Sequence, residues 1–587
     1  MVSLKTVSED VKQSGGPFYD RRVRTVAVAI VLVVHLSLLA MTAREKSVTS
    51  DEPYHIGRGV SALFSGDFRM SVAHPPLINL ASALPLVFFD DLQVPTMDAS
   101  WNNPTADPAL RKYRFSRLFL WAGGTWAWPG NDDPLAIIFW SRVPIMVMSA
   151  ALGLLVYLWA GRLWGAGAGF FGLLLYCFNP TVLAHGCLAT TDTGASLFIF
   201  AFAMSLWRHL KAPAWWTLLL AGLTFGLAQL SKFTSILLIP LAMLIMFLHA
   251  PGGAREKIKA FFSIKRPQWM TGLPGYVVVL IAGAFVIWAG YGFEVDSIHE
   301  IKVPASDLAF GIGFSIKRVF VEIMKAVPVP PRTYYFGLSR TLVDTAEHYH
   351  PLYFLGEVRS EGWWYYYPVL FLIKEPVALL VLMVLAPFVW RKKRGSFRTT
   401  LMVSGVIGIG SLVFFMFLNN KNIGIRHILP VYPFLFLVLC RLGSIGSRSL
   451  ISKASWVLVA IYVANGLISF PDYLVHFNSL VGGPDNGLRY SVVGEDWGQD
   501  VAALGDFIEE NGIKKIYYNN YGNAYPQAYG VPAEPLSCGQ SGPGWYAVHI
   551  VDLLRPRKDS PPDCYEMLEK QEPAKVIHHT IYVYRIE

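Results

Sequence analysis

Residues 21–52 read RRVRTVAVAIVLVVHLSLLAMTAREKSVTSDE, and this stretch decides the fold class of the chain. Its arginines are followed by an apolar run over about residues 25–42, long enough for a helix to cross about 30 Å of hydrocarbon. A basic flank before an apolar run could also mark a secretory signal. The length of the run and the many apolar runs after it favour an uncleaved first helix, with residues 1–24 in the cytosol.

Further apolar runs of spanning length follow along most of the chain. The sequence is 53% hydrophobic and only 16% charged, whereas soluble domains are about a quarter charged. It therefore predicts a polytopic α-helical membrane protein of about eleven spans. The spans after the first are expected at about 135–160, 166–185, 194–209, 215–231, 233–249, 273–292, 366–390, 399–418, 423–441 and 454–471.

Basic residues predict the side of the membrane that each loop faces. Counted from a cytosolic N-terminus, the basic loops Arg255–Arg266, Arg391–Arg398 and Arg441–Lys453 all face the cytosol. Two long polar loops, at about 43–134 and 293–362, face the outside. The net charge of +9 then reflects topology signals and contacts with membrane lipids, so no nucleic acid partner is expected.

The transmembrane domain is expected over residues 25–471, and residues 472–587 are expected to form a small α/β domain outside the membrane. Cys538 and Cys564 lie in this segment, and an extracytoplasmic location would allow a disulfide between them, which the sequence leaves open. The regular elements of the segment are expected to be a helix at Asp500–Asn511 and strands at Lys514–Tyr518, Trp545–Val551 and Lys575–Arg585.

Asp51 and Glu52 are the strongest local signal for chemistry. Two adjacent acids at a membrane interface are costly unless they are solvated or used. The simpler reading is a solvated start of the first outer loop. Tyr54, His55 and the run His74-Pro75-Pro76 follow closely, and a transferase that deprotonates a hydroxyl needs such a carboxylate within hydrogen-bond reach of the acceptor.

The order of these residues resembles a known family. Asp51-Glu52-Pro53-Tyr54-His55 followed by His74-Pro75-Pro76-Leu77 is similar to the first lumenal loop of dolichyl-phosphate-mannose protein mannosyltransferases. Those enzymes and the lipid A aminoarabinose transferase belong to the GT-C class of membrane glycosyltransferases. Further stretches resemble bacterial, phospholipid-carrier-dependent members: Asn179-Pro180, Ala189–Asp192, Leu230–Phe233, Gly424–Pro430, Gly482–Gly487 and Asp496–Asp500.

The resemblance implies roles for the acidic and histidine positions that match. Asp51 would be the general base that activates the acceptor hydroxyl, and Glu52 would orient the acceptor or tune Asp51. His74 would hold the donor or the loop geometry, with His55 in support. Asp192 would be a second acidic site residue or, on the simpler reading, the N-cap of its helix.

Four cationic or histidine positions could bind the phosphate of a donor, because a leaving phosphate needs stabilisation of its developing charge. The resemblance and the predicted topology favour Arg426, His427 and Lys232. Lys374 lies within an apolar run, where an ionisable group suggests function. The alternatives are snorkelling of Lys232 to the interface and pairing of Lys374 with Glu375 or another buried acid.

Two departures from the family leave the acceptor open. The aminoarabinose transferases have Lys rather than His before the two prolines, and the β-trefoil domain of the eukaryotic mannosyltransferases is not evident here. Some relatives hold a divalent metal, and His55, His74 and the acids could supply ligands. The spacing is not diagnostic, so a metal stays open.

The sequence thus predicts an inverting glycosyltransferase, similar to mannosyltransferases, in a bacterial inner membrane with its site on the extracytoplasmic face. It would move a monosaccharide from a polyprenyl-phosphate carrier to a hydroxyl acceptor on protein, lipid or glycan. The alternative from another class is a polytopic transporter or lipid flippase, although internal repeats, typical of transporters, are not evident. The sugar, the acceptor, the carrier and the oligomeric state stay open.

Overall fold

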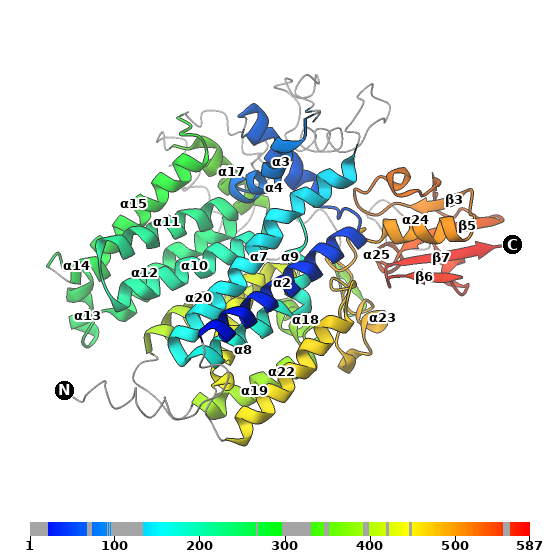
Figure 1. Cartoon of the computed structure of the whole chain (residues 1–587). Coiled ribbons are helices and arrows are strands. Elements are labelled where there is room, and N and C mark those ends of the chain that lie inside the picture. The colour runs from blue at the N-terminus through cyan, green and yellow to red at the C-terminus, as the bar shows by residue number, and fades with distance from the viewer. Residues whose placement is uncertain are drawn as a thin grey trace.

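The computed structural model describes residues 21–66, 73–90, 133–265, 268–295, 330–344, 352–390, 398–417, 422–444, 449–555 and 564–587, with positions 68, 92 and 94. Within these residues the protein is a polytopic α-helical membrane protein with a small α/β domain at its C-terminal end (Figure 1). Several predicted loops lie wholly or partly outside the described residues: segment 1–24 up to residue 20, loops 43–134 and 293–362 in part, and the basic loop at 391–397.

Six helices in the described part are long and apolar enough to cross a membrane. They are α2 (Arg21–Glu45), α7 (Pro134–Trp164), α15 (Leu273–Gly290), the apolar stretch Thr399–Phe417 of α20 (Arg398–Phe417), the run Ile425–Gly443 and α22 (Leu450–Ile468). The run Ile425–Gly443 consists of η6 (Ile425–Val431), α21 (Tyr432–Leu439) and η7 (Cys440–Gly443).

Three bent helix pairs raise the number of candidate spans to nine. The pairs are α8 (Ala166–Cys177) with α9 (Pro180–Gly186), η4 and α12 (Phe233–His249) with α13 (Ala254–Phe261), and α18 (Tyr366–Lys374) with α19 (Val377–Trp390). The sequence predicted about eleven spans. The remaining two are the helices α10 (Asp192–Lys211), which is charged at both ends, and α11 (Trp215–Ser231), which has only 17 residues.

Prolines account for two of the bends. Pro180 follows Asn179, whose side chain accepts a hydrogen bond from the Val182 amide and so begins α9 after a turn of 63°. Pro376 disfavours a helical conformation for Glu375, where α18 ends before a turn of 111°. The two breaks meet inside the bundle, because Asn179 Nδ2 donates to Glu375 Oε2 over 2.6 Å.

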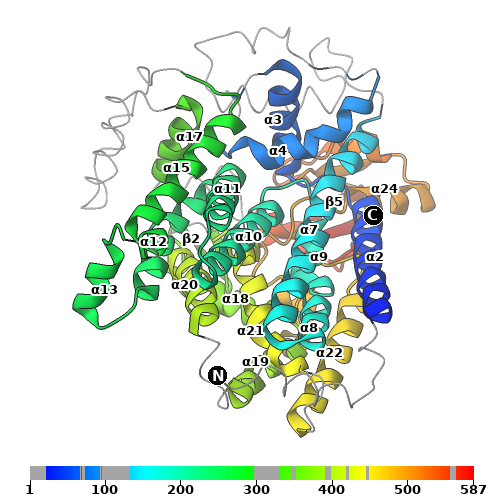
Figure 2. The same cartoon turned by 60° about the vertical axis from the view of Figure 1, so that its left-hand side comes forward.

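Small residues allow the spans to pack closely. Helix α11 lies against α15, and a side chain on Gly222 would come within 2.5 Å of the Ala282 Cβ atom. The same holds one turn on, at Gly226 against Val286. Close approach through small residues is the usual way in which membrane helices associate. Helix α10 lies in the centre of the helical part, in contact with α7, α11, α20 and η6 (Figure 2).

Two short helices cover one end of this bundle. Helix α3 (Glu52–Ser65) begins with Pro53 in its first turn and ends at Gly66, and it packs on α4 (Pro76–Ala83). Figure 1 shows both at the end of the bundle opposite to α13, the helix in the basic loop. Helix α17 (Arg332–Asp344) lies near α15 at the α3 end.

The C-terminal part contains a five-stranded sheet in the order β4-β3-β5-β7-β6. Strand β3 is parallel to β4 and β5, and β7 is antiparallel to β5 and β6. The expected helix corresponds to α24 (Val501–Glu510). The strands are β3 (Ile516–Asn519), β4 (Ala533–Pro535), β5 (Gly544–His549), β6 (Lys575–Ile577) and β7 (Ile581–Ile586).

The single strand predicted at Lys575–Arg585 is instead a hairpin of β6 and β7. His578 and His579 adopt positive φ angles of 43° and 67°, which turn the chain back on itself. The pattern of apolar and polar side chains along both strands predicted a single continuous strand. Cys538 and Cys564 form a disulfide with a Cα–Cα distance of 4.7 Å, the pairing that the sequence left open.

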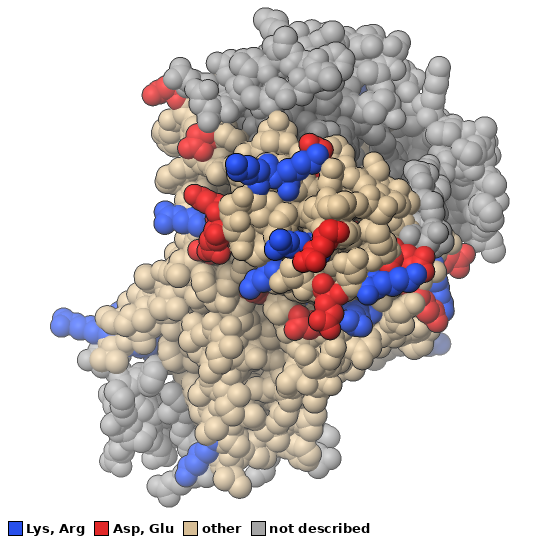
Figure 3. Space-filling model, turned by 90° about the vertical axis from the view of Figure 1, so that its right-hand side faces the viewer, with Lys and Arg blue, Asp and Glu red and all other residues tan. Residues whose placement is uncertain are grey.

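Figure 3 shows the face of the molecule that carries the C-terminal domain. Acidic and basic side chains gather on it in the middle of the view, and the surface below them is nearly free of charge. A surface of this kind is typical of a helical part within lipid and a domain within water.

The C-terminal domain is joined to the helical part by buried contacts. The ammonium of Lys46, at the end of α2, lies 2.5 Å from Asp472 Oδ1 and 2.6 Å from Asp500 Oδ1. Elsewhere the two backbones touch: Gly424, before η6, lies against Gly494, and both have positive φ angles, of 92° and 93°. Only residues without a side chain allow this approach.

Gly494→Ala is expected to lower the free energy of unfolding by about 2–4 kcal/mol. The added methyl group would meet the Gly424 Cα atom and the Ile423 carbonyl oxygen at 2.7 Å each, in a backbone conformation that disfavours alanine. Gly512→Ala is the matched control, because Gly512 also has a positive φ but no atom within 4 Å of the added group. Thermal unfolding in detergent would measure both variants, and equal losses would contradict this contact.

Candidate functional site

Asp51 and Arg426 form an ion pair at the candidate site. Asp51 precedes α3, and its Oδ2 atom lies 2.6 Å from Nη1 of Arg426 in η6. The Asp51 side chain is 38% exposed and that of Arg426 is 12% exposed. The structure therefore brings together two of the residues that the sequence predicted as base and phosphate ligand.

Glu52, the adjacent acid, is completely buried. Its carboxylate accepts five hydrogen bonds from described residues: from Nε and Nη2 of Arg142, from the amide and hydroxyl of Thr49, and from the amide of Ala189. Burial alone would raise the pKa of Glu52, but the Arg142 guanidinium and these hydrogen bonds hold it below its usual value.

This environment corrects one predicted role. A carboxylate with no exposed surface does not contact an acceptor, so Glu52 does not orient the acceptor directly. Its bonds instead join three segments that meet at the site: the residues before α3, helix α7 and the residues before α10. The other predicted role, tuning of Asp51 by the neighbouring negative charge, stays a prediction.

Arg142 is a site residue that sequence reasoning missed. Besides Glu52, its Nη1 atom donates to the carbonyl oxygens of Ala43 and Lys46, and its Nη2 atom donates to that of Ser47. The guanidinium thus holds the whole turn between α2 and α3. A signal was present, because a lone arginine within the predicted span 135–160 is an intramembrane charge and so a candidate for function.

Arg58 is a second missed residue. It lies in α3, is buried, and among the described residues its Nε atom has no hydrogen-bond partner. Burial lowers the pKa of Arg58 to about 10, and the negative charge of Asp51 opposes this shift. Arg58 therefore stays protonated at neutral pH and adds positive charge beside Asp51.

Asp192 and Lys232 form a second charge pair. The Lys232 ammonium lies 2.5 Å from Asp192 Oδ1, and both side chains are largely buried. Thr191, not Asp192, occupies the N-cap position of α10, and the Asp192 side chain is directed to the lysine instead. His185 of α9 is buried nearby, and its carbonyl oxygen accepts a hydrogen bond from the hydroxyl of Thr193, the residue after Asp192.

A double replacement is expected to separate packing from function at this pair. Asp192→Asn or Lys232→Met alone should lower stability by about 2 kcal/mol, because each leaves one buried charge without its partner. The double variant should regain most of this stability and still transfer little sugar if the charges serve the reaction. Melting curves and transfer rates on the same samples would measure this. Full activity of the stable double variant would make the pair purely structural.

The sequence left Lys374 either as a phosphate ligand or as the partner of a buried acid. The structure agrees with the second prediction, and the acid is Glu495 rather than Glu375. The Lys374 ammonium lies 3.5 Å from Glu495 Oε1 and donates to the Leu474 carbonyl oxygen over 2.9 Å. Glu375 instead accepts hydrogen bonds from Asn179, Thr181 and Tyr432. This enclosed arrangement fits a structural ion pair better than a phosphate site.

The predicted histidines lie in two places. The rings of His55 and His74 are 5.0 Å apart, and His55 Nδ1 lies 2.9 Å from Asn79 Oδ1. His427 packs with Tyr367 and Phe415, with its ring 6.4 Å and 5.6 Å from theirs. Both aromatic residues therefore contact η6 directly after Arg426.

In the described part of the chain His55 and His74 lie close together, but Asp51 and Glu52 do not join them in a group of three or more potential metal ligands. The three potential ligands that do gather there are Asp472, Asp500 and His578, and the Lys46 ammonium already binds both aspartates. A metal is therefore not supported by this donor set, and no step below depends on one.

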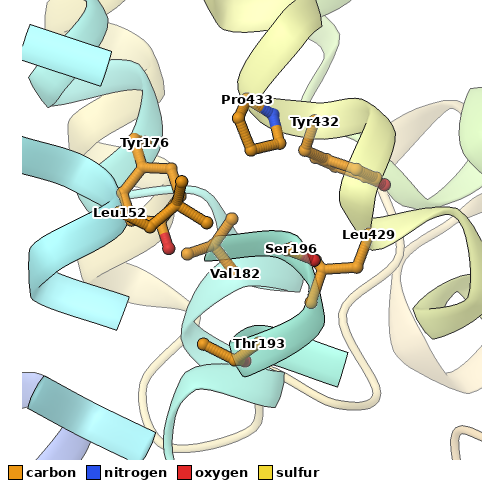
Figure 4. A pocket seen from close by; sticks show the side chains of 8 residues that line it. All are labelled: Leu152, Tyr176, Val182, Thr193, Ser196, Leu429, Tyr432 and Pro433. Atoms are coloured by element: carbon orange, nitrogen blue, oxygen red, sulfur yellow. The ribbon is translucent and has the colours of Figure 1, made fainter. Parts of the chain in front are cut away.

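A small cavity lies in the bundle between α7, α8, α9, α10 and the η6–α21 segment (Figure 4). Leu152, Val182, Leu429 and Pro433 give it an apolar wall, and the hydroxyl-bearing residues Thr193 and Ser196 come from α10 just after Asp192. It has room for roughly one water molecule, so it does not hold a sugar or a lipid chain.

Comparison with known proteins agrees with the resemblance seen in the sequence. Residues 137–288, about a quarter of the chain, match the family described as dolichyl-phosphate-mannose-protein mannosyltransferase. This segment contains Arg142, Asp192 and Lys232, whereas Asp51 and Arg426 lie outside it. The resemblance to this family is thereby confirmed over the matched residues. The comparison with curated proteins gives no match.

Two solved structures are similar to the chain at low identity. ArnT from Cupriavidus metallidurans bound to undecaprenyl phosphate has 12% identity and a TM-score of 0.45, over 95% of this chain and 97% of that chain. Archaeal oligosaccharyltransferase AglB from Archaeoglobus fulgidus, in complex with an inhibitory peptide and a dolichol-phosphate, has 12% identity and a TM-score of 0.42, over 92% of this chain and 70% of that chain.

Proposed function

We propose that this protein is a membrane glycosyltransferase that transfers a monosaccharide from a polyprenyl-phosphate carrier to a hydroxyl group, with inversion at the anomeric carbon. The observation that carries the proposal is the exposed Asp51 carboxylate, paired with Arg426 at 2.6 Å beside the second pair Asp192–Lys232. The family match over residues 137–288 supports the same reaction class.

The reaction needs one base and a held phosphate. The acceptor hydroxyl attacks the anomeric carbon while the bond from that carbon to the phosphate oxygen breaks, and the carrier phosphate leaves with the electron pair. Asp51 takes the hydroxyl proton, for which its exposure suits it better than the buried Glu52 and Asp192. A single displacement of this kind inverts the configuration.

The cations around Asp51 provide for the leaving phosphate. Arg426 and Arg58 both lie beside Asp51, and Lys232 is the cation of the second pair. Positive charge at the point where the phosphate gains charge lowers the barrier. Lys374 is left out of this set because of its enclosed pair with Glu495.

The distribution of basic residues along the chain favours a site on the outer face of the membrane. Arginines precede the apolar part of α2, and Asp51 follows its other end, so the positive-inside rule assigns Asp51 to the extracytoplasmic side. The basic helix α13 lies at the opposite end of the bundle from α3, in accord with this orientation (Figure 1). The bacterial character of several motifs favours a bacterial inner membrane, with the C-terminal domain outside it.

Sugar transfer by the purified full-length chain in nanodiscs would test the proposal. Radiolabelled polyprenyl-phosphate sugars would be supplied with protein, lipid and glycan acceptors, and the same sugars as nucleotide derivatives would serve as controls. Transfer from the lipid-linked donors alone is expected. Absence of transfer, together with movement of the labelled lipid across vesicles containing the protein, would favour the transporter alternative.

A further inference from the structure

Trp497 lies in the loop that leads from the membrane helices to the sheet, and it contacts Arg426 and the residue directly before Asp51. Its indole centroid is 4.0 Å from Cζ of Arg426, the distance of a cation–π contact. Its carbonyl oxygen accepts a hydrogen bond of 3.0 Å from the amide of Ser50, the residue directly before Asp51. One residue thus holds the guanidinium by its ring and the carboxylate segment by its backbone.

The same ring also contacts a neighbour of the second charge pair. It meets the ring of His185 edge-on at 5.9 Å, and His185 lies beside Asp192. The Trp497 side chain is only 4% exposed. It therefore has no free face on which a sugar could stack, and its contacts are all with the protein.

The loop around Trp497 is itself firmly held by the C-terminal domain. Asp496 accepts a hydrogen bond from the Gly498 amide and pairs with His549 of β5 at 3.0 Å, and His549 Nε2 lies 2.6 Å from the Tyr518 hydroxyl. Burial would lower the pKa of His549, but the Asp496 carboxylate more than offsets this and raises it. A buried, paired group of this kind gives the loop one conformation.

A second set of bonds ties this loop to the turn before α3. The Ser47 amide donates to the Gln499 carbonyl oxygen over 2.9 Å, and the Val501 amide donates to the Ser47 hydroxyl over 2.9 Å. Asn523, after β3, donates to the Ser50 carbonyl oxygen over 2.6 Å. The sheet domain therefore forms one wall of the turn that presents Asp51.

We propose that Trp497 is a positioning residue of the transfer reaction, which fixes the orientation of Arg426 and, with its backbone, the location of Asp51. This role rests on the proposed function. It makes the C-terminal domain a working part of the site, because the motif Asp496–Asp500 joins the sheet to the catalytic carboxylate. If the domain had no part in the reaction, loss of these contacts would not change the rate of turnover.

Three variants of the full-length protein in nanodiscs separate positioning from simple packing. Trp497→Leu removes the aromatic face, Trp497→Phe keeps one, and Trp159→Leu is the matched control. Trp159 is a fully buried tryptophan of α7 that packs against Phe200 and Trp207 in the bundle core. Each variant would be assayed for kcat and for the KM of the donor.

Trp497→Leu is expected to lower kcat by about 10- to 100-fold, with a change in donor KM of less than about threefold, since misplacement rather than binding is affected. Trp497→Phe should stay within about threefold of the native kcat, because a phenyl face still attracts the guanidinium. Trp159→Leu should lower the melting temperature and leave kcat unchanged. Equal losses of kcat in the two leucine variants would overturn the proposal.

A second readout does not depend on turnover. Phenylglyoxal modifies arginine side chains, and mass spectrometry of the peptide that contains Arg426 would give its rate of modification. This rate should rise about fivefold or more in Trp497→Leu and stay at the native value in the other two variants. An unchanged rate in Trp497→Leu would overturn the proposal even if no donor is ever transferred, whereas failed transfer by the native protein would overturn only the proposed function.

Discussion

Asp51→Asn is expected to lower the rate of sugar transfer by about 10³-fold, within the range that a general base contributes. Asparagine has nearly the same shape as aspartate but does not accept the proton of the acceptor hydroxyl. The effect should fall on kcat, because the cations that hold the donor phosphate remain. Initial rates at saturating donor, with purified protein in nanodiscs, would measure it.

The fold should survive this replacement. Asp51 is 38% exposed, and partly exposed ion pairs contribute only about 1 kcal/mol or less. Asp485→Asn is the matched control, because Asp485 is an exposed aspartate that pairs with His579 away from the site. Its transfer rate should equal that of the native protein. Native rates in Asp51→Asn would remove Asp51 from the mechanism and leave the base unassigned.

Glu52→Gln is expected to act on folding instead, lowering the free energy of unfolding by about 3–5 kcal/mol. The change leaves the Arg142 guanidinium buried without its counter-ion. It also places an amide donor against the backbone amide of either Thr49 or Ala189, each of which now donates to one carboxylate oxygen. Unfolding in detergent, followed by heat or denaturant, would measure the loss.

Two controls make this prediction specific. Glu357→Gln removes an acid from an exposed pair with Arg359, and it should cost about 1 kcal/mol or less. The double variant Glu52→Gln with Arg142→Met should regain part of the lost stability, because no uncompensated charge remains. Equal stabilities of Glu52→Gln and Glu357→Gln would contradict the buried pair.

The buried Glu52–Arg142 pair should also make the stability of the protein depend on pH. The pKa of Glu52 in the folded protein lies below its usual value of 4.5. Its contribution is therefore complete above about pH 4.5 and is lost as the pH falls further through the folded-state pKa. Glu52→Gln should lack this acid-side loss, which stability curves between neutral and acidic pH would reveal.

The helical architecture could be predicted because it depends on local properties of the chain. An apolar run of about 20 residues must form a helix in lipid, whatever it packs against. All eleven predicted spans correspond to helices, although two of them are bent, at Asn179-Pro180 and at Glu375-Pro376. The bend angles were not predicted, since a proline limits where a helix stops but not the direction in which the chain continues.

The candidate site could be predicted only in part. The motifs named Asp51, Asp192, Lys232 and Arg426, and the structure pairs them two by two. Arg142 and Arg58 were missed, because the stretches that resemble the family contain neither of them. Lys374 resembled a site residue in the sequence, yet it pairs with Glu495, an acid 121 positions along the chain.

The sequence by itself determined that the chain crosses the membrane many times, which ends of its helices are basic, and that two acids follow the first span. Only the tertiary structure decided which of these acids is exposed. Asp51 meets Arg426, 375 positions away, while Glu52 meets Arg142, 90 positions away, in the interior. Adjacent residues on a helix start point in different directions, and their surroundings come from segments whose approach no local pattern encodes.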